Sequence, residues 1–75
     1  MPGFKITDHD DSEAVIGVRK HIAAIREAKS QFLASYNHAY ALGWIGALRS
    51  VGRINEKTSE RLVTEVNAAF EHRCP

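Results

Sequence analysis

Apolar and small side chains recur at a helical spacing through the middle of the chain. Between Ser12 and Val51 there is no proline, and the apolar positions advance by a mean step close to the helical repeat of about 3.6 residues. These positions are Val18, Ile22, Ile25, Leu33, Tyr36, Tyr40, Gly43, Ala47 and Val51. The pattern predicts helix over residues 12–51. A continuous helix would be roughly 60 Å long, which is long for a globular protein, so a break near Lys29 is the alternative.

Gly52 is the expected end of this helix. A glycine just past a helix terminus adopts the left-handed conformation at little cost, and Asn55 is a good N-cap for the next helix. The pattern predicts a C-terminal helix over residues 55–72. Its apolar side is formed by Ser59, Leu62, Val63, Val66, Ala69 and Phe70. Because the connection is short, the two helices should be antiparallel neighbours in a helical hairpin.

Residues 1–11 are expected to form an extended N-terminal arm of a single helical domain, residues 1–75. Carboxylates and a hydroxyl cluster between Asp8 and Glu13, just before the periodic segment. Such groups accept hydrogen bonds from the free N–H groups at a helix start. The spacing of a calcium-binding loop is absent. Helix capping therefore explains the cluster better than a metal site.

The C-terminal helix is too short to cover the whole apolar side of the long one. Counted back from the turn, His72 lies near Ser35, which leaves one group of apolar side chains uncovered. This seam consists of Val15, Val18, Ile22 and Ile25. Two all-α arrangements would bury it: a three-helix bundle, or a dimeric four-helix arrangement. The unbroken periodicity favours the dimer.

A stripe of small residues follows one side of the second half of the long helix. Its members are Ser35, Ala39, Gly43, Gly46 and Ser50. Soluble helices seldom carry two mid-helix glycines without a packing reason, because each costs about 1 kcal/mol relative to alanine. The stripe predicts close contact with a neighbouring helix, either within the chain or across a dimer.

The side of the long helix opposite Tyr36 is expected to bind a protein partner. His38, Leu42, Ile45 and Arg49 share this side, and Trp44 flanks it. The hairpin partner is expected to leave this side open, and an apolar stripe with a histidine and an arginine there is typical of a protein-binding surface. The alternative is that an oligomer buries it as ordinary core.

The charge balance argues against a dedicated polyanion binder. Ten basic and nine acidic side chains give a net charge of +1. The lone Cys74 excludes an internal disulfide and, with no apolar signal segment at Met1, predicts a cytoplasmic protein. The uncharged stretch from Ser30 to Leu48 is long enough to span a bilayer, but its polar residues favour a helix buried by other helices.

No motif for catalysis, metal binding or a cofactor is found in the chain. The histidines and the single cysteine do not form a zinc-binding pattern, and there is no glycine-rich phosphate loop or nucleophile elbow. A chain of this size also rarely supplies the concave pocket that an active site needs. We therefore expect no enzyme activity and no cofactor.

The first functional hypothesis is a small regulator or inhibitor that occupies the surface of a partner protein, as a homodimer. In size and in its hairpin from Trp44 to Phe70, the chain resembles the short helical proteins of bacteriophages and other mobile elements. That resemblance implies inhibition of a host protein by direct binding. The alternative is a nucleic-acid-binding module that uses the basic turn. The basic residues are Arg49, Arg53, Lys57 and Arg61.

Overall fold

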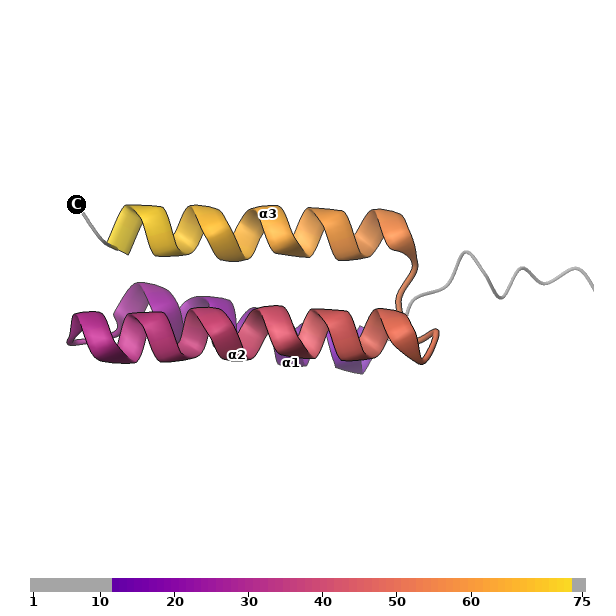
Figure 1. Ribbon diagram of the computed structural model, residues 1–75, viewed down its shortest axis with the longest axis horizontal. Coiled ribbons are helices and arrows are strands. Elements are labelled where there is room, and N and C mark those ends of the chain that lie inside the picture. Colours follow the sequence, from indigo (N-terminus) through magenta and orange to yellow (C-terminus); the bar gives the residue numbers. More distant parts are fainter. Residues whose placement is uncertain (1–11, 74–75) are drawn as a thin grey trace, which may run out of the picture.

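The computed structural model describes residues 12–73, which form three α-helices (Figure 1). The helices are α1 (Ser12–Glu27), α2 (Gln31–Ser50) and α3 (Glu56–Arg73). Each helix packs against the other two, and α2 runs antiparallel to both α1 and α3. The predicted all-α fold, with a hairpin at its C-terminal end, is confirmed. The expected N-terminal arm lies outside the described residues.

The long helix predicted over residues 12–51 is broken after Glu27. Ser30 is the N-cap of α2: its backbone is extended (φ −143°, ψ 159°), and its hydroxyl accepts a hydrogen bond of 3.1 Å from the backbone N–H of Leu33. A serine at this position satisfies an otherwise free donor of the new helix. The chain reverses here, so the expectation of an unbroken seam, which favoured a four-helix dimer, is wrong. The alternative, a three-helix bundle, is correct.

Aliphatic side chains from all three helices form the core. The largest fully buried ones are Val18, Ile25, Ile45, Leu62 and Val66. The folded-back α1 supplies Val18, Ile22 and Ile25 to this core, and Val15 packs against it while partly buried. The four seam residues are therefore covered within one chain.

The turn between α2 and α3 has the geometry that Gly52 predicts. Gly52 has φ +80°, in the left-handed region. Its N–H donates to the carbonyl of Arg49 at 3.1 Å, and the N–H of Arg53 donates to the carbonyl of Leu48 at 2.9 Å. These two bonds form a Schellman motif, which satisfies carbonyls at the end of α2.

The start of α3 is capped as predicted. The side-chain oxygen of Asn55 accepts a hydrogen bond of 2.8 Å from the backbone N–H of Thr58. Ile54, between the turn and the cap, is buried with 3% of its surface exposed. The connection is therefore held at both helix ends and by one core side chain.

Two polar contacts set how the helices lie against one another. Arg19 of α1 makes a two-pronged ion pair with Glu65 of α3, at 3.2 Å from Nε to Oε1 and 3.1 Å from Nη2 to Oε2. On the other side of α3, His38 Nε2 lies 2.8 Å from Asn67 Oδ1, and the His38 ring stacks on Phe70 at 4.4 Å. Both contacts are partly exposed, so they orient the helices more than they stabilise them.

We expect Ile45→Ala to lower the free energy of unfolding by about 3 kcal/mol, because it removes a buried side chain and leaves a cavity. Ile45 exposes 1% of its surface, whereas Ile16 exposes 56%. The matched change Ile16→Ala should alter stability by no more than about 0.5 kcal/mol. Chemical denaturation followed by circular dichroism measures both. Equal effects of the two variants would contradict the described core.

Gly52→Ala should destabilise the protein by about 1–2 kcal/mol, because alanine is strained in the left-handed region. Gly17 provides the control, since a Cβ atom there would meet nothing within 4 Å and its φ is helical. Gly17→Ala should raise stability by about 1 kcal/mol through helix propensity alone. Thermal unfolding of the two variants should thus shift the midpoint in opposite directions.

Candidate protein-binding surface

One side of α2 is left exposed by the other two helices, and one edge of it borders α1. The core side of this helix is made by Ala34, Ala41, Ile45 and Leu48, and α1 and α3 both pack there. The side turned outward is exposed, and we call it the outer α2 face. Its residues are Phe32, Ser35, Tyr36, Ala39, Tyr40, Gly43, Trp44, Gly46, Ala47 and Ser50.

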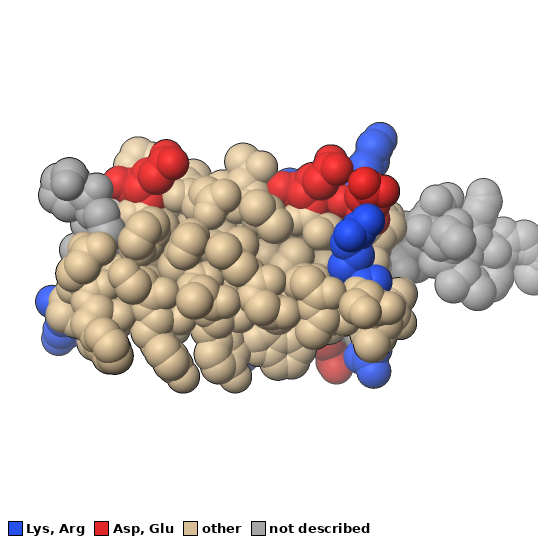
Figure 2. Space-filling model, viewed as in Figure 1, with Lys and Arg blue, Asp and Glu red and all other residues tan. Residues whose placement is uncertain are grey.

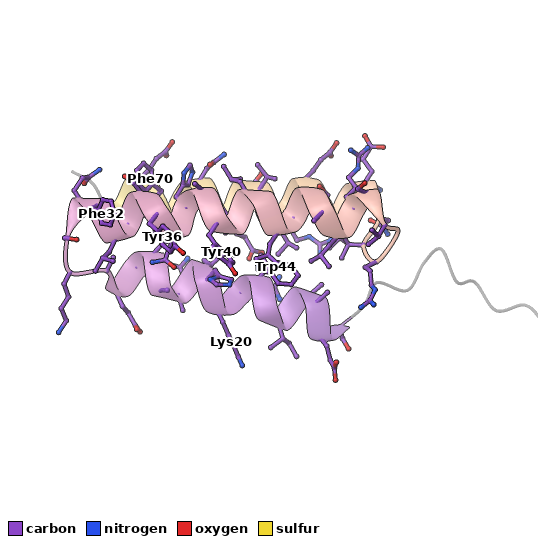
Figure 3. All side chains as sticks on the ribbon, turned by 60° about the horizontal axis from the view of Figure 1, so that its bottom comes forward. Lys20, Phe32, Tyr36, Tyr40, Trp44 and Phe70 are labelled. Carbon is purple, nitrogen blue, oxygen red and sulfur yellow. The ribbon has the colours of Figure 1, made fainter. Side chains whose placement is uncertain are left out.

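Four large aromatic side chains repeat every four residues along this face and form what we call the aromatic ridge. The exposed fractions are 75% for Phe32, 55% for Tyr36, 43% for Tyr40 and 43% for Trp44. They lie in a row on the side of α2 that borders α1 (Figure 3). The Tyr36 and Tyr40 ring centroids are 5.9 Å apart, and His21 of α1 approaches Tyr40 at 4.6 Å. A contiguous exposed apolar patch of this kind usually marks an interaction site.

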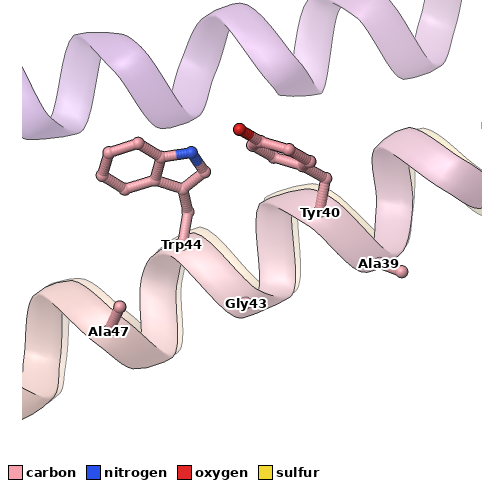
Figure 4. A pocket seen from close by; sticks show the side chains of 5 residues that line it. All are labelled: Ala39, Tyr40, Gly43, Trp44 and Ala47. Atoms are coloured by element: carbon pink, nitrogen blue, oxygen red, sulfur yellow. The ribbon is translucent and has the colours of Figure 1, made fainter.

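A shallow groove of about 430 Å³ accompanies the ridge. Its lining is almost entirely apolar and comes from Ala39, Tyr40, Gly43, Trp44 and Ala47. Figure 4 shows the Tyr40 and Trp44 rings directed toward α1, with Gly43 and the methyl groups of Ala39 and Ala47 leaving the helix surface low. An apolar depression beside aromatic rings can accept side chains from another protein.

The two glycines of the outer α2 face have no packing role inside the bundle. A Cβ atom added to Gly43 or to Gly46 would meet nothing within 4 Å. All five residues of the predicted contact line are exposed, so the line is not buried against another helix within residues 12–73. The contact across a dimer stays a prediction, because no second chain is part of the structure.

The side of α2 that was predicted to bind a partner belongs instead to the bundle. Ile45 is buried in the core, and Leu42 packs against it while partly buried. His38 contacts α3 through Asn67 and Phe70. The expectation that the hairpin leaves this side open is wrong, because α3 lies along it. Of the predicted partner-binding residues, Trp44 alone lies on the outer α2 face.

Tyr36, Tyr40 and Val51 were expected to be apolar contacts of the long seam, and they are exposed. The core and outer sides of α2 are thus exchanged relative to the prediction. The repeat of four aromatic residues at every fourth position was the sequence signal that could have identified the outer face. Bulky aromatic rings there contrast with the aliphatic side chains, such as Ile45 and Leu48, that fill the core.

Charged side chains are absent from the outer α2 face. α2 carries one charged residue, Arg49, near its C-terminal end. In Figure 2 the front of the molecule over α2 is uncharged, while charges gather at the ends and along α3. α1 and α3 expose several charged side chains, such as Lys20 and Glu60. The lack of charge is therefore specific to one side of the bundle.

The basic residues of the nucleic-acid hypothesis lie around the turn and the first part of α3. Arg49 Nη2 is 3.7 Å from Glu56 Oε1, with both side chains more than half exposed. Arg53, Lys57 and Arg61 are also exposed. Glu56 and Glu60 share this end, so the basic residues do not form an unmixed positive surface. The hypothesis stays a prediction, and a gel-shift assay at low salt with Arg53→Glu tests it.

Within residues 12–73, no three His, Cys, Asp or Glu side chains lie close enough together to hold a metal ion. No helix of the described part is long and apolar enough to cross a membrane. Comparison of the chain with protein-family models, curated protein sequences and solved structures found no match.

We expect Phe32→Gln to change the free energy of unfolding by no more than about 0.5 kcal/mol, because an exposed side chain leaves little burial to lose. Phe70→Gln is the matched control. Phe70 is half-buried against the core and stacks on His38, so its loss should cost about 2 kcal/mol. Denaturant unfolding at low protein concentration distinguishes them. A large loss of stability with Phe32→Gln would show that the aromatic ridge stabilises the folded chain.

Proposed function

We propose that the protein is a small helical regulator or inhibitor that binds another protein through the outer α2 face. The observation that carries this proposal is the aromatic ridge, which stays exposed beside an apolar groove on an uncharged side of the bundle. Tyrosine and tryptophan are the residues that most often dominate the energy of protein interfaces. Tyr36, Tyr40 and Trp44 have the chemistry and exposure of such anchors.

The shape of the surface favours a helical partner. The ridge and groove run along α2, whose 20 residues span roughly 30 Å at about 1.5 Å per residue. A partner helix with an apolar stripe can lie along such a surface, as in other helix-in-groove complexes. The absence of charged side chains means that the partner need not supply matching charges.

The two glycines of the outer α2 face also support a protein-binding function. Gly43 and Gly46 lower the helix propensity of α2 by about 1 kcal/mol each relative to alanine, and nothing inside the bundle requires them. Their absent side chains allow a partner backbone to approach α2 closely. This explains why a helix would keep both glycines on its outer side.

The surface offers contact area and little reactive chemistry. Among the residues that line the groove, the Tyr40 hydroxyl is the only titratable group. Binding that blocks or repositions a partner is the activity that such a surface can supply. The resemblance to small proteins of mobile elements also supports the inhibitor role.

An arginine placed in the groove should abolish partner binding. In the variant Ala39→Arg, a charged side chain replaces a methyl group that lines the groove; Ala23→Arg, at an exposed position of α1, is the matched control. Immobilised full-length proteins would be incubated with extract of the native host, and the retained proteins quantified by mass spectrometry. We expect a partner that the wild type and Ala23→Arg retain and that Ala39→Arg loses at least tenfold. The purified partner should then show the same order of affinities by calorimetry.

Retention of the same proteins by all three chains would contradict the proposal. Circular dichroism of Ala39→Arg should match the wild type, because Ala39 is exposed and arginine is a good helix former. A loss of binding can then be assigned to the surface and not to unfolding.

A further inference from the structure

The outer α2 face is divided into a bulky half and a small half. Before Gly43, the face carries the exposed rings of Phe32, Tyr36 and Tyr40, and the Tyr40 ring is directed toward α1. After Gly43, the face carries the exposed small residues Gly46, Ala47 and Ser50, and also Trp44, whose ring is directed toward α1. The face is therefore raised at the N-terminal end of α2 and low at the C-terminal end.

An antiparallel copy of α2 complements this profile. A two-fold axis through Gly43 lays the N-terminal half of one helix on the C-terminal half of the other, and the same contacts occur twice. Counted from Gly43, Tyr36 lies seven positions before the axis and meets Ser50, seven positions after it. Tyr40, three positions before the axis, is level with Gly46, and the helical rotation per residue places it nearer to Ala47, one position further on. Two bulky side chains thus meet small ones on each side of the axis, whereas Phe32, eleven positions before it, falls opposite position 54, beyond the end of α2.

We propose that a second copy of the chain occupies the outer α2 face, in an antiparallel α2–α2 pair centred near Gly43. This inference rests on the proposed function, because it takes the outer α2 face to be a protein-binding surface and names its occupant. Another partner that uses this face would then have to displace the second copy.

The absence of charge is consistent with self-association. Across a two-fold axis a surface meets itself, so a patch of one charge would be placed near a patch of the same charge. The outer α2 face has no charged side chain, and Arg49 lies at its end beside Glu56 of the same chain. Two copies can therefore meet without desolvating or opposing charges.

The available area fits a small dimer. Taking about 200 Å² for a fully exposed aromatic side chain, the exposed fractions of Tyr36, Tyr40 and Trp44 correspond to roughly 300 Å² on each copy. Standard interfaces bury about 800 Å² per partner. These three rings supply roughly a third of this area, and the groove with the small residues of the face lies in the same contact. Glycine at the axis brings the helices close enough for both parts to be buried together.

The mass of the full chain in solution tests the inference. Light scattering after size-exclusion chromatography should give twice the 8.4 kDa of the chain at high micromolar concentration. Gly43→Arg should remain monomeric at the same concentration, with at least a hundredfold weaker self-association. Its circular dichroism should be unchanged, because a side chain at position 43 meets nothing in the bundle. Ala23→Arg, which adds the same charge to α1, should dimerise like the wild type.

Trp44 reports on the same contact by fluorescence. It is the only tryptophan of the chain, it is 43% exposed, and it lies beside the proposed axis. Its emission should shift to shorter wavelength as the wild-type concentration rises through the dimer transition. The emission of Gly43→Arg should not depend on concentration.

Cysteine cross-linking tests the antiparallel register. In a Cys74→Ser background, Gly43→Cys places two thiols at the axis, within the Cα separation that a disulfide allows. Ser50→Cys is a control on the same face, because its two copies would be roughly 20 Å apart along an antiparallel pair, at about 1.5 Å per residue. Mild oxidation should cross-link Gly43→Cys and leave Ser50→Cys monomeric.

Three results would overturn the inference: a monomeric wild type at high micromolar concentration, a dimer that Gly43→Arg leaves intact, or cross-linking of Ser50→Cys as rapid as that of Gly43→Cys. The proposed function fails by a different result. If the wild type is a dimer but retains no host protein in a manner that depends on Ala39, the proposed regulator function is contradicted and the dimer is not. If the wild type is a monomer and Ala39→Arg loses its host partner, the proposed dimer is contradicted and the regulator function is not.

Discussion

The hydrogen bond from the Leu33 N–H to the Ser30 hydroxyl separates α1 from α2. It caps α2 where the chain reverses, so that α1 lies beside α2 and does not extend it. Only this reversal brings Ile25 together with Ile45 and Leu62 in one core. A continuous helix would have left the apolar side chains of α1 for a second chain to cover.

The reversal also decides which side of α2 stays open. A helix in a three-helix bundle is covered on the side that faces its two neighbours, and its remaining side meets solvent. In α2 that remaining side carries the aromatic ridge and two glycines in place of charged residues. A chain this short gains little from leaving such a surface exposed unless something binds it. The reversal of the chain before α2 therefore determines both the fold and the surface that is available to a partner.

The parts of the fold that the sequence predicted well are those set by local chemistry. Gly52 adopts the left-handed conformation, and Asn55 caps α3. Ser30 is also a local cap, but the apolar pattern continues on both sides of it. The pattern therefore favoured a continuous helix over a break at one residue. The site was predicted less well. Ile45 was expected on the partner-binding side and is in the core. The prediction failed because α2 is apolar or small on nearly every side, so its periodicity alone does not show which side faces the core.

The sequence by itself determined the helical class, the hairpin turn and the existence of more apolar helix surface than one hairpin can bury. These depend on residue spacing and on contacts within a few positions of the chain. The tertiary structure decided where α1 goes, and with it which side of α2 is core and which is surface. That choice depends on how three helices pack together, with aliphatic side chains such as Leu62 filling the interior and rings such as Tyr36 remaining outside. Packing between distant segments is a property that no local pattern contains.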